Sequence, residues 1–177
     1  MTSHALRTGL LLLGAAGSGL LLFWSLTLSL GFVRGAPFVP TRRARAAKML
    51  EFARPRPGES WIDLGSGDGR LLIAAARAGA TAVGYEFHPL LIFWSRLAIR
   101  FHGLQGLAEV RRGDLWAADV SKADVVSIYM MPWWMLRMQK KLRAELKPGC
   151  RVVSNAFLFP DWAPAAYEDR VALYLQP

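Results

Sequence analysis

The stretch that decides the fold is residues 63–70, Asp-Leu-Gly-Ser-Gly-Asp-Gly-Arg. It follows the apolar run 61–64 and leads into the alanine-rich run 68–78, so we interpret it as the turn between a first strand and a first helix. Glycine accepts positive φ and lets a ligand approach the backbone closely. In doubly wound α/β folds, this turn is where a nucleotide binds.

Outward from this turn, strand-like and helix-like segments alternate, which predicts a mostly parallel sheet with helices on both faces. The fold class we expect is therefore α/β, a Rossmann-like doubly wound sheet. The further strands are predicted at 82–87, 109–112, 124–131, 151–154 and 171–176, the last pairing with 166–168. The further helices are predicted at 42–54, with Thr41 as N-cap, at 89–101 and at 132–146.

The loop does not fit the two common phosphate-binding patterns. A dinucleotide fingerprint needs G-x-G-x-x-G, and counting from Gly65 the last position is Arg70. No phosphate-binding lysine follows, so the loop is not a P-loop either. The carboxylate of Asp63 at the head of the loop would repel a pyrophosphate and suits a cationic ammonium group instead.

Two more acids complete a candidate cofactor site. Glu86 ends the second strand, 23 residues after Asp63, where an acid accepts hydrogen bonds from ribose hydroxyls. Asp114 follows the third strand and is placed either to accept from an adenine amino group or to act as a helix N-cap. A ribose, an adenine and an ammonium group without phosphates describe S-adenosylmethionine. The predicted cofactor-binding residues are Asp63, Gly65, Ser66, Gly67, Asp68, Gly69, Glu86 and Asp114.

Residues 58–153 resemble class I, seven-strand S-adenosylmethionine-dependent methyltransferases, including Leu-Lys-Pro-Gly at 146–149 before the fifth strand. More narrowly, the chain resembles the membrane-anchored protein-lysine methyltransferases of the mitochondrial inner membrane and their bacterial relatives. That resemblance implies lysine methylation in membrane proteins, since the family modifies the ADP/ATP carrier and the ATP synthase c-subunit. It is carried by the hydrophobic N-terminus, Pro-Phe-Val-Pro at 37–40, residues 63–70, Gly-Tyr-Glu at 84–86, Asp-Leu-Trp at 114–116, and Phe159, Pro160 and Trp162.

Two departures from the family concern the acceptor more than the cofactor. His88 stands where the family usually has Asn, and Arg45 where Gln is expected. The fourth strand ends without the Asp/Asn-Pro-Pro-Tyr/Phe run that holds planar amino groups, which favours a stronger nucleophile such as a lysine amine. Tyr129, Met131 and Trp133 are the predicted substrate slot, and no catalytic base is named. For Trp133, Trp134, Met135 and Met138 as a group, core and helix packing is favoured over a substrate cage.

The N-terminus predicts a membrane anchor. Residues 9–33 form an uncharged run of 25 residues, where about 20 suffice to span a bilayer. Lysines and arginines concentrate after this run, which places the larger domain on the cytoplasmic side of a bacterial inner membrane, or at the mitochondrial inner membrane in a eukaryote. A cleaved signal peptide, a transit peptide and a buried helix are the alternatives. The expected organisation is an anchor at 1–35, a linker and amphipathic helix at 36–57, and a cofactor-binding domain at 58–177.

The net charge of +9 does not by itself indicate nucleic-acid binding. Residues 1–57 hold eight lysines or arginines and one acid, whereas residues 58–177 hold fourteen and twelve, so the excess follows the hydrophobic run. We therefore expect no nucleic-acid partner. The three histidines are scattered and predict no metal site, and Cys150 is expected to be a small core residue. Arg137, Lys140, Lys141, Arg143 and Lys147 are expected to form a solvated helix face, with membrane-surface contact as the alternative.

A protein-lysine methyltransferase is one interpretation of these features. Two alternatives are compatible with the same loop and anchor: a lipid or small-molecule methyltransferase, and a membrane protein that binds the cofactor without catalysis.

Overall fold

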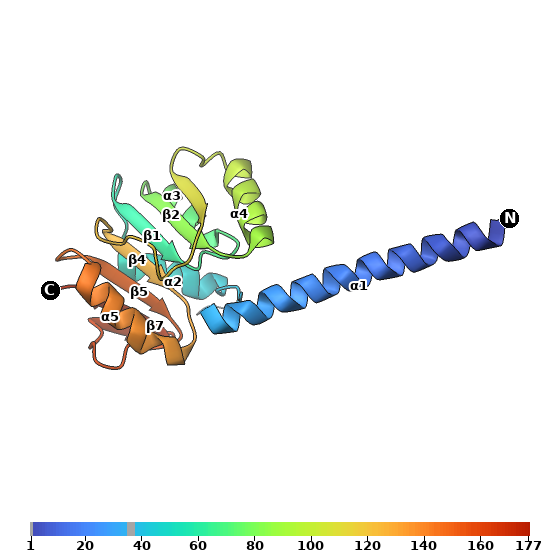
Figure 1. Ribbon diagram of the computed structural model, residues 1–177. Helices are drawn as coiled ribbons and strands as arrows, with labels where there is room; N and C mark the ends of the chain where they lie inside the picture. The colour runs from blue at the N-terminus through green and yellow to red at the C-terminus, as the bar shows by residue number, and fades with distance from the viewer. Residues whose placement is uncertain (1, 35–37) are drawn as a thin grey trace. The chain divides into compact units, whose positions relative to one another are not determined.

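The computed structural model describes residues 2–34 and 38–177. The chain divides into two compact units, Met1–Pro37 and Phe38–Pro177. In the first, α1 runs from Thr2 to Arg34 (Figure 1), and its leucines at 10–13 and 20–22 are exposed on every side of the helix. Among the described residues, no helix combines the length and apolar character needed to cross a membrane. The span expected over 9–33 therefore stays a prediction.

The second unit is built on a seven-stranded sheet with the order β3-β2-β1-β4-β5-β7-β6 (Figure 1). The first five strands are parallel, and β7 runs antiparallel between β5 and β6. This confirms the predicted α/β sheet and the pairing of the last strand with 166–168. The strands are β1 Ser60–Leu64, β2 Thr81–Glu86, β3 Ala108–Arg112, β4 Val125–Ile128, β5 Arg151–Asn155, β6 Ala166–Glu168 and β7 Val171–Leu175.

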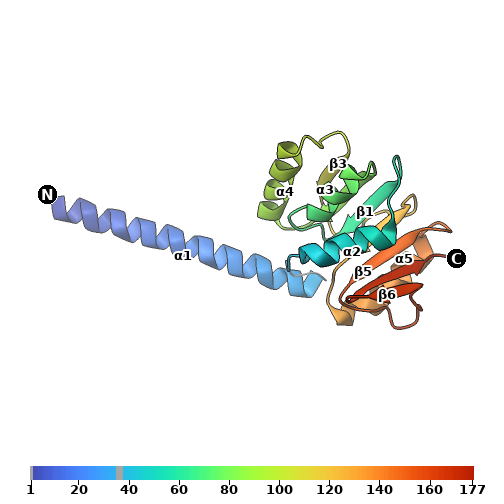
Figure 2. The same cartoon turned by 180° about the vertical axis from the view of Figure 1, so that it is seen from behind.

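Helices cover both faces of this sheet. Figure 2 shows α2 (Arg43–Ala53) and α3 (Arg70–Arg77) in front of the strands, with α5 (Met135–Glu145) behind them. Helix α4 (Pro89–Phe101) packs against β2 and β3. Its buried side chains belong to the same hydrophobic core as those of α2 and α3, and this core includes the fully buried Trp61. The amphipathic helix expected in residues 42–54 is thus α2, and its Met49 and Ala53 are buried in this core.

The boundaries differ from expectation at three places. The fourth strand stops at Ile128, and the helix after it begins as the 3-10 turn Pro132–Trp134 before α5, a common start for an α-helix. Met131, the residue before the proline, stays extended. Helix α3 starts at Arg70 and not at 68, because the loop glycines hold positive φ up to Gly69. Thr41 is not an N-cap: it is buried, and its hydroxyl accepts a hydrogen bond from Asn155 Nδ2 at 3.4 Å.

Candidate functional site

The glycine-rich loop between β1 and α3 has a backbone that only glycine accepts easily. Gly65, Gly67 and Gly69 have φ of 89°, 57° and 78°, in the left-handed region. The N–H groups of Gly65 and Ser66 donate to the carbonyl of Tyr85 at 2.9 and 3.1 Å. The loop is thereby fixed to the carboxyl end of β2, as expected for a ligand-binding turn in this fold.

The predicted acids meet at one edge of the sheet. Asp63 lies in β1, Glu86 ends β2, and Asp114 follows β3, and these three strands are adjacent. The N–H of Gly113 donates to the carbonyl of Glu86 at 3.1 Å, which places Asp114 beside the end of β2. Sequence reasoning therefore placed all three residues at the same edge correctly.

Asp63 is the most buried of the three, with 4% of its surface exposed. Its Oδ1 accepts a hydrogen bond from Ser127 Oγ at 2.7 Å, and Ser127 in turn accepts from Trp61 Nε1 at 2.9 Å. Burial raises the pKa of Asp63 to about 7, and although the Ser127 hydrogen bond opposes this, the charges of Glu86 and Asp68 add to it. Burial and the neighbouring acids thus disfavour the charged form of Asp63, and a cationic ligand group nearby would favour that form again.

Glu86 already holds part of the loop in place. Its carboxylate accepts N–H bonds from Gly67 at 2.9 Å and from Phe87 and His88, both at 2.8 Å. Burial raises the pKa of Glu86, although these three backbone bonds act in the opposite direction. An ionised carboxylate offers about four acceptor positions. Three of these positions are used, so a two-pronged contact to a ribose diol needs one of the three backbone N–H groups to move away.

Asp68 is engaged by the arginine that begins α3. It forms an ion pair with Arg70, which raises the pKa of Arg70, and Arg70 Nη1 also donates to the carbonyl of Thr41. A Cβ atom on Gly67 would lie 3.0 Å from the ring of Phe38, so that ring packs directly on the loop. Residues 38–41 therefore cover the loop, a role that sequence reasoning missed by treating them as a linker.

Asp114 is exposed, and its Oδ1 accepts the N–H of Trp116 at 3.0 Å. The segment that follows is a turn and not a helix, so Asp114 caps a turn and is not a helix N-cap. Ser66 is buried against the backbone of β2, where a Cβ on Gly84 would come within 2.5 Å of it.

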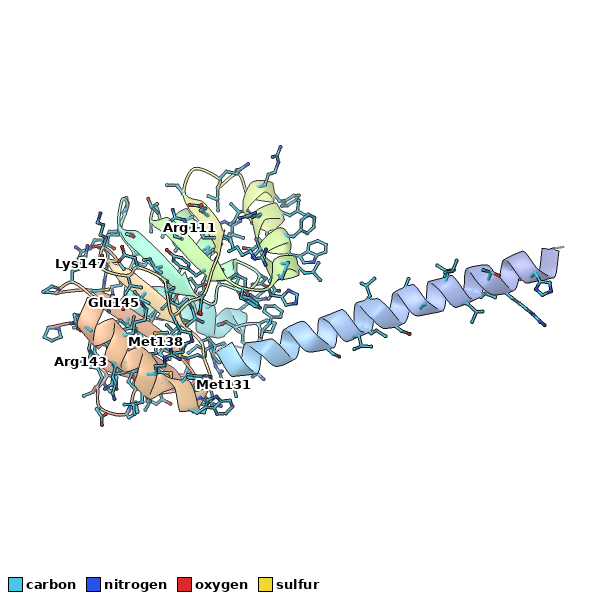
Figure 3. The ribbon with its side chains drawn as sticks, in the orientation of Figure 1. Arg111, Met131, Met138, Arg143, Glu145 and Lys147 are labelled. Carbon is cyan, nitrogen blue, oxygen red and sulfur yellow. The ribbon has the colours of Figure 1, made fainter. Side chains whose placement is uncertain are left out.

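An aromatic group lies near the predicted substrate slot. The rings of Trp116 and Trp134 are 5.6 Å apart, and the guanidinium of Arg137 lies 4.2 Å from the Trp116 ring centre and 5.7 Å from that of Trp134. Trp133 is 59% exposed, whereas Tyr129 and Met131 of the slot are less exposed, Met131 being partly exposed at the start of the 3-10 turn. The structure confirms the packing role for Met135 and Met138, which are buried (Figure 3 labels Met138).

The basic residues of α5 are not a simple solvated face. Besides the stacked Arg137, Lys141 pairs with Glu145 and donates to the carbonyl of Ala118 at 2.8 Å. Arg143 lies 5.3 Å from the ring centre of Trp162. Arg137, Lys140, Arg143 and Lys147 are exposed, as expected for a solvated face, and Lys141 is partly buried. The aliphatic stems and charges of Arg137, Lys141 and Arg143 also find partners in the adjoining loops.

A shallow pocket lies at the amino end of the parallel strands, lined by Glu59, Asp124, Lys147 and Arg151 among others. Its charges pair with each other: Lys147 lies 2.6 Å from Asp124, and Arg151 pairs with Glu59. Figure 3 shows Lys147 and Met131 toward opposite ends of α5. This pocket shares no lining residue with the glycine loop, and both of its acids are paired with basic residues.

Other residues singled out in the sequence are structural. Cys150 is buried, and burial raises its pKa to about 12, which leaves it protonated at neutral pH. Phe159 and Trp162 stack at 5.4 Å and pack around the buried Tyr174. Across residues 2–34 and 38–177, no group of three or more His, Cys, Asp or Glu side chains is arranged to hold a metal ion.

Comparison with known proteins gives one consistent family. Residues 63–166 match the family described as the ANTKMT methyltransferase domain. The human lysine N-methyltransferase of the ATP synthase c-subunit is 42% identical over 128 residues, which cover 72% of this chain and 54% of the human protein. Mouse adenine nucleotide translocase lysine N-methyltransferase is 38% identical over 182 residues, which cover 95% of this chain and 79% of the mouse protein.

The fold also matches a solved structure. The crystal structure of an RNA methyltransferase from Salinibacter ruber in complex with S-adenosyl-L-homocysteine has a TM-score of 0.73 and 38% sequence identity. The match covers 78% of this chain and 92% of the Salinibacter chain.

Proposed function

The chain belongs to the ANTKMT methyltransferase family, of the class I S-adenosylmethionine-dependent fold, and from that premise we propose that it methylates lysine side chains of membrane or membrane-proximal proteins. The proposal rests mainly on the glycine loop, which lies beside acidic residues at the carboxyl ends of β1, β2 and β3. The same loop lies in a family whose relatives are named as lysine methyltransferases. The chain spans about half the length of the human relative, so the acceptor is argued from the chemistry of the site.

The residues present fit S-adenosylmethionine. The buried Asp63 and the nearby Asp68 and Glu86 give negative charge for its cationic methionine end, and Glu86 stands where a ribose is bound in this fold. Positive φ at the loop glycines keeps the backbone open to a close ligand. When bound, the cofactor supplies an electrophilic methyl group on a sulfonium, and the protein's part is to bind it and to align the acceptor.

A lysine acceptor must lose its proton before it can attack. At pH 7 only about one amine in 2,500 is neutral, so the site must offset about 4.6 kcal/mol. Desolvation against apolar side chains lowers the pKa of an amine by up to several units. Tyr129 and Met131 lie beyond the end of β4 and supply such surface, and the exposed Trp133 adds to it. No dedicated base is needed for this step.

Membrane association is part of the proposal. The uncharged residues 9–33 lie within the single helix α1, and leucines at 10–13 cover all its sides, the pattern of a helix that is buried all round. We propose that α1 anchors the protein and that the basic residues after it keep the enzymatic domain on the cytoplasmic side. Substrate lysines would then lie close to the bilayer surface.

One experiment separates this proposal from its rivals. Full-length protein is incubated with methyl-labelled S-adenosylmethionine and native membranes, and with purified cellular RNA in parallel. Label recovered as methyl-lysine in a membrane protein supports the proposal. Label in the lipid extract identifies a lipid methyltransferase, and label in RNA an activity like that named for the Salinibacter neighbour. Cofactor binding without transfer to any fraction indicates a non-catalytic binding protein.

A further inference from the structure

Helix α4 exposes an unusual amount of apolar surface. It supplies five of the twelve exposed large apolar side chains in residues 38–177. Their exposed fractions run from 36% to 86%, with Phe101 the highest. These five side chains, called the α4 apolar face below, are Leu90, Phe93, Trp94, Leu97 and Phe101.

The α4 apolar face is one continuous strip. At 3.6 residues per turn, its five positions fall within an arc of about 100°. The opposite side of α4, at Leu91, Ile92, Ser95 and Ile99, is buried toward β2 and β3. The helix is thus apolar on two sides, and the domain core covers only one of them.

The charged residues of helix α4 itself all have one sign. Helix α4 contains no Asp or Glu, and its two charged residues, Arg96 and Arg100, lie along one border of the strip. Arg96 donates to the carbonyl of Val110 at 3.0 Å, which holds its guanidinium beside the helix. On the adjoining β3, Arg111 (labelled in Figure 3) is paired with Glu109, and Arg112 is exposed beside it.

We propose that the α4 apolar face lies in the headgroup region of an anionic bilayer, as a second membrane contact. Trp, Phe and Leu on one side of a helix, with arginine along the border, are the composition of interfacial helices. An anionic surface complements the arginines, whereas a neutral apolar partner would leave them without a counter-charge. The proposal is independent of which acceptor is methylated.

This contact also determines where the cofactor loop faces. Helix α4 begins three residues after Glu86, and a Cβ on Gly69 would overlap Ser95 Oγ on the buried side of the helix. The helix is therefore packed directly on the loop. Its docking therefore sets the orientation of the loop relative to the bilayer, and α4, about 20 Å long, lies along that surface.

The test uses residues 38–177, which contain the whole sheet and every buried core side chain of the described residues, and so have what they need to fold alone. Sedimentation is measured with vesicles of phosphatidylcholine alone and of phosphatidylcholine mixed with phosphatidylglycerol. We expect binding to the anionic vesicles, weakened by salt. Phe93→Ser with Phe101→Ser should lower the partition coefficient by at least about tenfold.

The matched control removes exposed apolar surface elsewhere, with Tyr167→Ser and Leu175→Ser on β6 and β7. It should leave partitioning unchanged, and circular dichroism checks that both variants are folded. Absence of partitioning, or equal partitioning of both variants, overturns the proposal. Light scattering that shows a lipid-free dimer, dissociated only by the α4 substitutions, also overturns it and assigns the face to a second copy.

Discussion

Asp63→Asn tests the electrostatics of the site, because it removes one ionisation and keeps the shape. Asn retains an oxygen to accept the hydrogen bond of Ser127 Oγ, which is 2.7 Å away in the native protein. What changes is the buried acid, whose pKa rises from 3.8 to about 7 in the folded domain. Because of this shift, the free energy of unfolding of the native domain should depend on pH through Asp63.

The sign and size come from linkage. Between pH 3.8 and about 7 the folded protein keeps a proton that the unfolded chain has released, so the free energy of unfolding falls as pH rises. A shift of about three pKa units corresponds to about 4 kcal/mol when the acid is fully ionised. The stability of Asp63→Asn relative to the native protein should therefore increase from about pH 4 to about pH 8, by an amount of that order.

Urea unfolding of residues 38–177 at a series of pH values measures this difference. Asp119→Asn is the control, since Asp119 is exposed and its pKa is lowered by the Ser121 hydrogen bonds, so it gives no such rise. A difference between Asp63→Asn and the native domain that stays flat with pH would refute the reasoning. The same variant should lose about 10- to 100-fold in S-adenosylmethionine affinity, from a lost charge-assisted contact, although it is the more stable protein.

Four further outcomes are expected. Glu86→Ala should weaken S-adenosylmethionine binding by about 10- to 100-fold in calorimetry, because charge-assisted bonds are worth about 1.5–3 kcal/mol; NAD binding in its place would contradict the cofactor. Gly69→Ala should destabilise the domain by about 1–3 kcal/mol more than Gly103→Ala in thermal unfolding, because both have positive φ but only Gly69 faces a close atom, Ser95 Oγ. Arg137→Ala should raise the KM for the protein acceptor and leave cofactor affinity unchanged; an unchanged KM would exclude the Trp116–Trp134 cluster from acceptor binding. Deleting residues 1–37 should leave cofactor binding intact and remove salt-resistant membrane attachment; loss of binding would show that the loop depends on the first unit.

The sheet and the glycine loop could be predicted from the sequence because both follow from patterns of neighbouring residues. Three glycines in 65–69 fix the turn, and strand ends in a parallel sheet meet at one edge, so the positions of Asp63 and Glu86 followed from topology. What it did not reveal were side-chain partners far apart in the chain. The contact of Ser127 with Asp63 joins positions 64 residues apart, and a serine in an apolar strand gives no sign of it.

The covering segment 38–41 was missed for a related reason. Pro40, with Pro37 before the segment, is typical of a linker. The packing of the segment depends on Arg70, 29 residues from Thr41, and on Asn155, 114 residues away. Likewise, the basic pattern of α5 correctly indicated solvent exposure, but it gave no sign of the stacking of Arg137 on Trp116, which lies in a loop of no regular periodicity. Local sequence patterns predict helices and strands, whereas contacts between elements that are distant in the chain become visible only in the folded structure.

The partners of α2 also set an order of events during synthesis. Lys48 pairs with Glu168, 120 residues later, and Arg151 donates to the carbonyl of Ala53 at 2.7 Å across 98 residues. The first helix of the domain to leave the ribosome thus waits for nearly the last strands to cover it, and such distant contacts slow folding. Until β7 emerges, Met49 has no complete core to enter. Chains interrupted before that point would expose α2 and become targets for chaperones and proteases.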